Sequence, residues 1–456
     1  MRPSLFELNP PMTPTLTDHP AADLRSAPRG PAHSDPTRSA QHLALMAATE
    51  RAASGLVGRS PEIEARRSLP PDIADMLAQA GLYRLLTPST YGGHEAAPAS
   101  FFLLIERLAR SDAAAAWCCF IANTTCLNAA YLPEAEARPI FSAPLLKAAG
   151  VFAPRGQAVP AVQDGVAGLR VTGRWAWGSG THNADIVVAG CLLLGPDGQP
   201  VLSAGDAAAG LPGGAPRVLS VVLERSQVRL LDNWDSFGLC GTGSGEFEVQ
   251  NAFVPLGRSA SLLDGPRLGT PLYRFPVFGL LALSIAAVAT GIALQTLADF
   301  VAQAGHSVPQ ASSKPLASKA TVQDAVARAE AGLQSARAYL LASVAAAWEA
   351  AQEAAQEASQ EVTQQNTQAN AQTSGSLPLA LRRDLRLAAS HAVQTSADVV
   401  GRLYRLAGGG AVFAHSPLQR ALRNVQVATQ HMMVNDASFE LTGRLLLGLP
   451  TQTAML

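Results

Sequence analysis

Three windows of this 456-residue sequence hold the residue types most able to do chemistry. The first, GRWAWGSGTHNAD, places two indoles, Trp175 and Trp177, on one face of an expected strand that breaks at Gly178-Ser179-Gly180. Glycines on both sides of a small hydroxyl let backbone amides and the Ser179 oxygen approach a planar ligand closely. A hairpin turn after a strand with core tryptophans explains the same residues without a ligand.

The second window, DNWDSFGLCGTGSGEFEVQ, is a loop punctuated by glycines, with Thr242 and Ser244 as hydroxyl side chains. It is superficially like a phosphate-binding loop, but no helix follows it and no lysine stands at the required spacing. As a nucleotide motif it is weak.

The third window, SPLQRALRNVQVATQHMMVND, predicts a helix with Arg420 and Arg423 on one face and His431 about two turns beyond Arg423. A histidine at this place could serve as an acid, a base or a hydrogen-bond donor near neutral pH. A core histidine beside Met432 and Met433 fits the window equally well.

Other patterns of catalytic or metal-binding residues are absent from the sequence. The remaining histidines show no HxH or HExxH spacing, so no metal site is expected. The sequence has no GxSxG elbow and no GxGxxG before a helix, which disfavours a serine hydrolase and a Rossmann nucleotide site. Five cysteines without a CxxC pair indicate buried, reduced thiols in a cytoplasmic protein.

Composition limits the partners. Lys and Arg total 34 against 35 Asp and Glu, and no basic stripe is present, so a nucleic-acid partner is not expected. The uncharged segment 275–298 has the length of a membrane span. Its polar residues Ser284, Thr290 and Gln295, and the lack of flanking positive clusters, favour a buried core helix over a span.

The elements that position these windows follow an α+β order of helices, then strands, then helices. We expect a disordered leader over 1–40, an amino-terminal helical domain over 41–149 and a β domain over 150–262. A carboxyl-terminal helical bundle should fill 263–456, with a low-complexity loop at about 351–376. The early Gln, Ala and Glu residues of that segment are expected to extend the preceding helix before a flexible hairpin loop. The last helices are expected over Thr321–Ala350, Arg382–Leu406 and Pro417–Leu447.

Five segments in this order resemble the acyl-CoA dehydrogenase superfamily, over roughly Ala44 to Leu449. They are LPPDIADMLAQAGLYRLLTPSTYGG, RLARSDAAAAW, VTGRWAWGSG, GLCGTGSGEFEVQNAFVP and AGGGAVFAHSPLQRALRNV. The resemblance implies an amino-terminal helical domain, a middle β domain, a carboxyl-terminal four-helix bundle and a flavin between them. It also implies a homotetramer.

The residue that should act as base in such a dehydrogenase is missing. A carboxylate must remove a proton while the flavin takes a hydride. The resemblance places that glutamate at Met432 or, in the alternative location, at Leu281, and neither side chain accepts a proton. The usual TEPxxGSD-type segment is replaced by VFAPRGQAVPAVQDG. Dehydrogenation by the usual mechanism is therefore disfavoured.

The segment WAWGSGTHNAD and the ATQH pattern are instead similar to the two-component flavin monooxygenases of the superfamily. These accept reduced flavin, FMN or FAD, from a separate reductase and react it with O2. The resulting flavin hydroperoxide oxidises a small aromatic, amine or sulfur compound. The resemblance implies that His431 holds the peroxide protonated in a dry pocket and that Ser179 bonds the flavin edge.

Further flavin contacts follow from the same resemblance. Trp177 would stack on the ring, and backbone groups of Phe152 and Gly180 would hold it. Gly409 and Gly410, in the glycine run at 408–410, would approach the flavin of a neighbouring subunit.

Two departures from the family concern the phosphate and the substrate. Where relatives carry a phosphate-binding arginine, this chain offers only Lys314 and Lys319. Where phenol-hydroxylating relatives carry a histidine, the pocket would be lined by Asn123, Thr125 or Asn128, which favours a neutral substrate.

Three functions remain in order of preference. A flavin-dependent monooxygenase leads, followed by an acyl-CoA dehydrogenase with a relocated base. A flavin-free binding or assembly protein with the same fold comes last.

Overall fold

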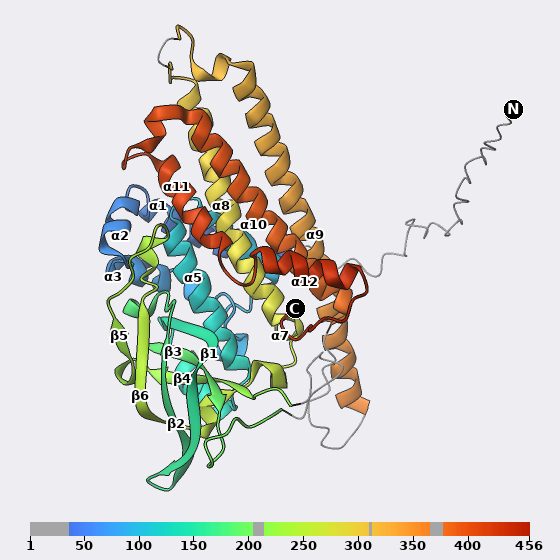
Figure 1. Ribbon diagram of the computed structural model, residues 1–456. Helices are drawn as coiled ribbons and strands as arrows, with labels where there is room; N and C mark the ends of the chain where they lie inside the picture. The colour runs from blue at the N-terminus through green and yellow to red at the C-terminus, as the bar shows by residue number, and fades with distance from the viewer. Residues whose placement is uncertain (1–35, 204–213, 310–311, 365–376) are drawn as a thin grey trace, which may run out of the picture. The chain divides into compact units, whose positions relative to one another are not determined.

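The structure is a computed structural model that describes residues 36–203, 214–309, 312–364 and 377–456 (Figure 1). The expected leader lies outside the described residues as far as residue 35. Residues 36–38 form a 3-10 turn, and helix α1 begins at Ala40, so the leader was predicted a few residues too long. The Ser39 hydroxyl explains this start, because it accepts the backbone N–H of His42 and caps the helix.

Six helices form the amino-terminal part: α1 (Ala40–Gly55), α2 (Ser60–Arg66), α3 (Pro71–Gln79), α4 (Pro98–Ala109), α5 (Ala113–Cys126) and α6 (Glu134–Phe141). Helix α3 ends just before Gly81, which takes a left-handed backbone conformation with φ of 75°. Helix α5 begins at the N-cap Asp112, whose carboxylate accepts the Ala115 N–H. Nearly every residue of α5 is buried, and the helix packs against the first strand of the sheet.

A seven-stranded sheet follows, in the order β5-β6-β2-β1-β3-β4-β7. Its strands are β1 (Ala148–Gln163), β2 (Val166–Trp175), β3 (Ile186–Leu193), β4 (Val218–Glu224), β5 (Arg229–Leu231), β6 (Glu246–Pro255) and β7 (Ser259–Ala260). The central strand β1 runs antiparallel to β2 and parallel to β3. Sequence patterns did not single out β1, because Pro154 and Pro160 interrupt it and its register shifts between Val151 and Gly156.

The carboxyl-terminal part is helical: α7 (Pro271–Arg274), α8 (Val277–Ala304), α9 (Ala320–Gln364), α10 (Leu379–Ala407), α11 (Pro417–Thr429) and α12 (Asp436–Leu446). Helices α8, α9, α10 and α11 lie alongside one another (Figure 1). The uncharged segment 275–298 lies largely in α8 and is a buried core helix, as expected. It and the window 113–130 are long and apolar enough to span a membrane, but most of each is buried within the chain.

One helix prediction was wrong. The segment Pro417–Leu447 is not one helix, because residues 430–435 turn away from α11 before Asn435 starts α12. The carbonyl of His431 accepts the N–H groups of Val434 and Asn435 in this turn. In the low-complexity segment 351–376, α9 continues to Gln364, in line with the expected helix extension. Residues 365–376, where the loop is expected, lie outside the described residues.

Candidate functional site

Trp117 of α5 connects the helical part to the two glycine-rich loops of the sheet. Its indole Nε1–H donates to Ser179 Oγ at 3.1 Å, and both side chains are buried. The two loops are also joined by their backbones. The N–H of Gly180 donates to the carbonyl of Thr242, and the N–H of Gly178 donates to the carbonyl of Gly245, both at 2.9 Å. The weak motif of the second window therefore supports Ser179 directly.

A chain of hydroxyl groups fixes the direction of the hydrogen bonds at Ser179. Its Oγ lies 2.6 Å from Ser244 Oγ, which lies 2.5 Å from Thr242 Oγ1, which is 2.8 Å from the carbonyl oxygen of Leu239. A carbonyl oxygen only accepts, so the Thr242 proton goes to Leu239, the Ser244 proton to Thr242 and the Ser179 proton to Ser244. Ser179 Oγ can therefore accept one more hydrogen bond but cannot donate one.

His431 lies in the turn between α11 and α12, with its ring centroid 6.1 Å from that of Trp117. Its Nδ1 accepts the backbone N–H of Met433 at 3.2 Å, so the proton of the neutral ring is on Nε2. Burial, aided by the positive charge of Arg386, lowers the pKa of His431 to about 4. At neutral pH the ring is uncharged, and its Nε2–H is a donor with no acceptor among the described residues.

The two indoles of the first window do not share a strand face. Strand β2 ends at Trp175, which is fully buried, stacks on Phe247 and donates its N–H to the carbonyl of Gly190. Trp177 lies beyond the strand in a left-handed conformation with φ of 65° and is 66% exposed. Trp175 thus belongs to the core, and the exposed Trp177 indole can stack on a planar ligand.

The three residues expected in the substrate pocket differ in how many of their side-chain hydrogen-bonding groups are unpaired. The Asn123 side chain donates to the carbonyl of Leu82 at 2.7 Å and accepts the N–H of Leu86 at 3.1 Å, so it holds neighbouring backbone in place. Thr125 Oγ1 and Asn128 Oδ1 are buried and have no hydrogen-bond partner. Hydrogen-bonding capacity for a substrate therefore remains at Thr125 and Asn128 but not at Asn123.

The remaining expected flavin contacts lie in two places. Phe152 is half-buried in β1. Lys319 is exposed in front of α9, and Gly409 and Gly410 are exposed after α10. Figure 1 shows these two connections at the end of the bundle that points away from the sheet. Within one chain, Lys319 and the glycine run are therefore not brought to the Trp177 loop.

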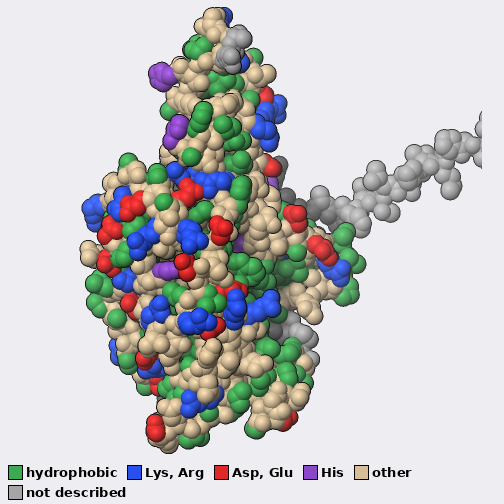
Figure 2. Space-filling model, turned by 60° about the vertical axis from the view of Figure 1, so that its left-hand side comes forward, with side chains coloured by type: hydrophobic (Ala, Val, Ile, Leu, Met, Phe, Trp, Pro, Cys, Tyr) green, Lys and Arg blue, Asp and Glu red, His purple; other side chains and the backbone are tan. Residues whose placement is uncertain are grey.

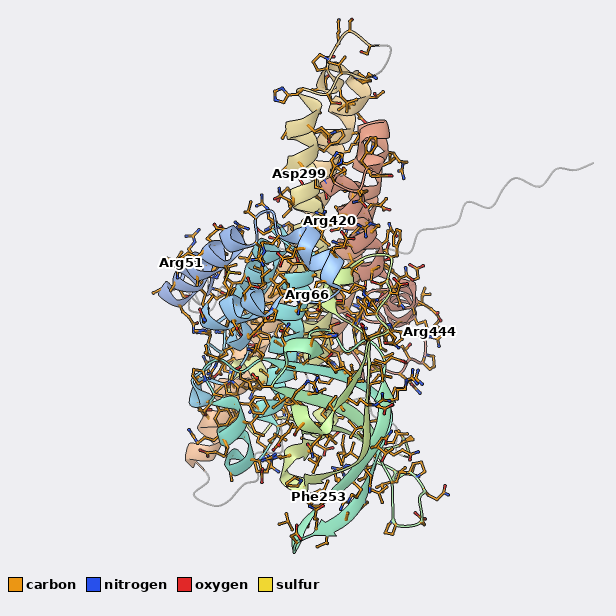
Figure 3. All side chains as sticks on the ribbon, turned by 90° about the vertical axis from the view of Figure 1, so that its left-hand side faces the viewer. Arg51, Arg66, Phe253, Asp299, Arg420 and Arg444 are labelled. Atoms are coloured by element: carbon orange, nitrogen blue, oxygen red, sulfur yellow. The ribbon has the colours of Figure 1, made fainter. Side chains whose placement is uncertain are left out.

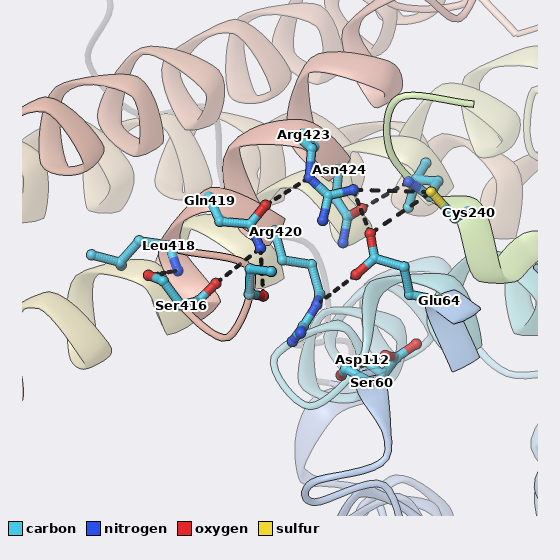
Figure 4. A network of polar contacts seen from close by, with 12 residues as sticks. Ser60, Glu64, Asp112, Cys240, Ser416, Leu418, Gln419, Arg420, Arg423 and Asn424 are labelled. Carbon is cyan, nitrogen blue, oxygen red and sulfur yellow. Dashed lines mark hydrogen bonds and ion pairs between the residues drawn. The ribbon is translucent and has the colours of Figure 1, made fainter. Parts of the chain in front are cut away.

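A junction of charged residues holds α11 against α2 (Figure 4). Glu64 accepts Arg420 Nε at 3.0 Å and also pairs with Arg423. Burial alone would raise the pKa of Glu64, but hydrogen bonds from Arg423 and Arg420 hold it below its ordinary value. Asn424 Oδ1 accepts the N–H of Leu239 at 2.7 Å. The junction thereby anchors the loop that ends in Thr242 and Ser244.

Figure 3 shows Arg420 and Arg66 at this junction of helices, with Phe253 of β6 at the far end of the sheet. On the face drawn in Figure 2, acidic and basic side chains are interspersed rather than gathered by sign.

Sequence reasoning missed two arginines on α10. Arg382 and Arg386 are 7% and 3% exposed, and neither forms an ion pair in the part of the chain that the structure describes. Burial lowers the pKa of Arg386 to about 10. The one available signal was their spacing of four, which places both in the apolar stripe of α10 with Leu385 and Ala389.

Cavities do not mark the site. A half-open hollow of about 270 Å³ lies between α6 and β4, lined partly by Glu224 and Arg258. A second, of about 10 Å³ beside Glu64, holds one water molecule at most. Neither includes Trp117 or Ser179, so the hydrogen-bond pattern identifies the candidate site.

Comparison with known proteins is consistent with this geometry. Residues 39–135 match the family model "Acyl-CoA dehydrogenase, N-terminal domain", and residues 283–436 match "Acyl-CoA dehydrogenase, C-terminal domain". An indole-3-acetate monooxygenase of Pseudomonas putida is 30% identical over 86% of this chain and 90% of its own. The flavin-dependent monooxygenase oxygenase subunit HsaA of Rhodococcus jostii is 26% identical over 82% and 90%. The structure of XiaF from Streptomyces, with FADH2 and glycerol, superimposes with a TM-score of 0.74 at 24% identity, covering 90% and 96%.

Proposed function

Because the chain belongs to the acyl-CoA dehydrogenase superfamily and is one of its flavin-dependent monooxygenases, we propose that it oxidises a small aromatic substrate of indole size. Reduced flavin, FMN or FAD, supplies the activation of O2 when it is bound. As in relatives named as oxygenase subunits, a separate reductase provides that flavin. The name of the indole-3-acetate monooxygenase supports the size of the aromatic ring.

The hydrogen-bond directions around Trp117 carry this proposal. Ser179 Oγ can only accept, and a reduced flavin ring carries an N–H on the edge where the oxidised ring has a bare nitrogen acceptor. The loop around Ser179 therefore suits reduced flavin better than oxidised flavin. The exposed Trp177 indole, with backbone groups of Phe152 and Gly180, would hold the ring.

His431 supplies the complementary donor. Its ring is neutral at pH 7 and keeps its proton at Nε2. His431 would therefore donate a hydrogen bond to an oxygen atom of the flavin peroxide without transferring the proton. Thr125 and Asn128 would bind the substrate, since each has a buried oxygen without a partner. A dehydrogenase base is not found at either family position: Met432 is exposed, and Leu281 is buried in the apolar core.

The proposed assembly is a homotetramer. Large apolar side chains are exposed on the helical part, among them Val412 and Phe413 beside the glycine run, and Leu446 and Leu447 at the end of α12. Exposed apolar surface of this kind indicates a covered interface. In such an assembly Lys319, Gly409 and Gly410 would contact the flavin of a neighbouring subunit. Light scattering should give four times the chain mass of 47.4 kDa.

The activity is tested with a flavin reductase, NADH and O2, using indole and indole-3-acetate as probes. We expect a hydroxylated product from at least one probe, and tighter binding of reduced than of oxidised flavin under anaerobic conditions. Tight binding of oxidised FAD, with bleaching by an acyl-CoA, would instead identify a dehydrogenase. If no flavin form binds, the chain is a binding or assembly protein.

The role of His431 is tested by His431→Ala, with His431→Gln as the control that keeps a donor. We expect His431→Ala to bind reduced flavin normally, to lose product and to release hydrogen peroxide, with a yield of product at least about 100-fold lower. Product formation at the normal ratio to NADH in His431→Ala would contradict this role.

A further inference from the structure

Leu239, the residue at which the hydroxyl chain from Ser179 ends, has a strained backbone. Its φ is 49° and its ψ is 32°, in the left-handed region that a leucine rarely adopts. The residue is buried, with 2% of its surface exposed. A bulky residue keeps this conformation only where the surrounding structure holds it on both sides. The peptide groups before and after Leu239 must therefore both be held by specific contacts.

The carbonyl group of Leu239 is held by three donors of its own loop. It accepts the hydroxyl of Thr242 at 2.8 Å, the backbone N–H of Thr242 at 3.1 Å and the indole N–H of Trp234 at 3.4 Å. The first of these bonds sets the order of protons that leaves Ser179 as an acceptor. The hydrogen-bonding character of Ser179 therefore depends on the direction of this one carbonyl group.

The N–H group of Leu239 is held from outside the loop, by Asn424 of α11. Asn424 Oδ1 accepts it at 2.7 Å. Figure 4 shows Asn424 next to Arg423, on the side of α11 that faces Cys240. Arg423 contacts the same loop but holds a different group, the carbonyl of Phe237, at 2.9 Å. Asn424 is thus the side chain that holds the peptide group before Leu239.

Close packing, rather than Asn424, fixes where this loop lies. A Cβ atom at Gly238 would lie 2.2 Å from the carbonyl oxygen of Arg423, and one at Gly241 would lie 2.2 Å from Cγ2 of Ile63. The two glycines therefore let the loop approach α11 on one side and α2 on the other. Replacing Asn424 should leave the loop in this place and release only one peptide group.

Without the bond to Asn424, the left-handed conformation of Leu239 loses its support on one side. Relaxation to a negative φ rotates the two peptide groups of Leu239 relative to each other, which takes the carbonyl oxygen out of line with the Thr242 hydroxyl. The hydroxyl groups then have no fixed final acceptor, so their protons can reverse and Ser179 can donate. An acceptor at Ser179 suits the N–H of reduced flavin, whereas a donor suits the bare nitrogen of oxidised flavin.

We propose that Asn424 is a positioning residue that sets the preference for reduced over oxidised flavin, because it holds Leu239 in the conformation that points its carbonyl at Thr242. The inference rests on the proposed flavin site at Ser179 and names the residue that determines its redox preference. Asn424 acts through the loop and not by contact with flavin or substrate. Since α11 also leads into the His431 turn, one helix positions both the acceptor and the donor of the site.

The test measures the dissociation constants of oxidised FMN and, under anaerobic conditions, of reduced FMN; both are then repeated with FAD. Asn424→Leu keeps the size of the side chain but removes the acceptor, and Asn424→Asp retains an acceptor oxygen. Asn183→Leu is the matched control, because Asn183 is also half-buried and bonds a backbone group, the carbonyl of Leu69, at 2.9 Å. Circular dichroism establishes that each variant is folded, and Asn424→Ala replaces Asn424→Leu if the latter is not.

The wild type should bind reduced flavin more tightly than oxidised flavin. In Asn424→Leu the ratio of the oxidised to the reduced dissociation constant should fall roughly 10-fold, the effect of about one hydrogen bond. Most of this change should come from tighter binding of oxidised flavin, which a general loosening of the site would not produce. Asn424→Asp and Asn183→Leu should keep the wild-type ratio.

A second variant tests whether Asn424 acts through the hydroxyl chain. Thr242→Val breaks the chain at its last hydroxyl and should lower the same ratio as much as Asn424→Leu does. The double variant should show no further decrease, because either change alone removes the fixed direction of the protons.

Two results would overturn the proposal. If Asn424→Leu leaves the ratio unchanged, or weakens both flavin forms equally, Asn424 only supports the fold of the loop. If the effects of Asn424→Leu and Thr242→Val add in the double variant, Asn424 does not act through Thr242. Failure of the proposed function is separate, because the wild type itself would then bind neither flavin form or would prefer oxidised flavin.

Discussion

Two pairs of arginines on neighbouring helices show how differently one residue type is used. Arg420 and Arg423 of α11 share the carboxylate of Glu64, and the three side chains fasten α11 to α2. Arg382 and Arg386 of α10 are more deeply buried, yet the described chain offers them no carboxylate. The first pair has its counter-charge within the fold, and the second pair donates to backbone carbonyl oxygens of Thr453 and Met455.

The comparison also links stability to function. The Glu64 junction anchors the loop that carries Thr242 and Ser244, and these hydroxyl groups set the hydrogen-bond direction at Ser179. The paired arginines therefore act on the site through the position of a loop.

The largest effect is expected from Glu64→Gln, which removes the shared counter-charge of Arg420 and Arg423. Partly buried cations left unpaired should lower the free energy of unfolding by about 3 kcal/mol, measured by urea denaturation. Glu62→Gln is the control, because Glu62 lies on the same helix in an exposed pair with Arg59. Equal losses of unfolding free energy in the two variants would show that the Glu64 junction stabilises the fold no more than an exposed ion pair does.

The pH dependence of stability should report the burial of His431, with a smaller contribution from the charge of Arg386. The His431 pKa is about 4 in the folded chain and about 6.5 unfolded. Between these values only the unfolded chain binds the proton. The free energy of unfolding should therefore be highest above pH 6.5 and fall by about 2 kcal/mol between pH 7 and pH 5.

His431→Gln should remove this part of the pH dependence in denaturation measured at pH 4, 5, 6 and 7. An unchanged profile in His431→Gln would mean that the folded chain does not lower the pKa of His431.

In the absence of ligand, Arg386→Met and Arg423→Met should change the free energy of unfolding in opposite directions. Replacing an unpaired buried charge by an apolar side chain should raise the free energy of unfolding by about 1 kcal/mol. Arg423→Met should lower it, because Glu64 loses a partner. Thermal unfolding of both variants decides the matter, and a loss in Arg386→Met as large as that in Arg423→Met would show that Arg386 supports the fold.

The smallest effect should come from Arg328→Ala on α9. Arg328 pairs with Asp324, but both side chains are at least half exposed. Solvent screening should limit the change in the free energy of unfolding to about 0.3 kcal/mol. A loss of 1 kcal/mol or more would show that exposure is a poor guide to the roles of arginines in this chain.

The sequence predicted what depends on local pattern. The uncharged helix α8 follows from its composition, and the structure confirms it as a buried core helix. The superfamily resemblance and the preference for a monooxygenase are confirmed by the comparisons. The roles proposed for Ser179 and His431 remain predictions.

What the sequence could not predict depends on contacts between distant segments. No glycine or proline marks the break after Thr429, so the turn that carries His431 is decided by packing. The separation of Trp175 from Trp177 required knowledge of where β2 ends. The environment of Arg386 required knowledge of which face of α10 is covered, and by which segment.

The hydroxyl chain that starts at Ser179 has one more consequence. Every proton in it points the same way, and it stops at the carbonyl oxygen of Leu239, which has no proton to pass on. A row of hydroxyl groups that ended in water would conduct protons between solvent and a flavin ring bound at Ser179. This row ends at a carbonyl oxygen, so in the proposed flavin site it would give protons no path to bulk water on that side.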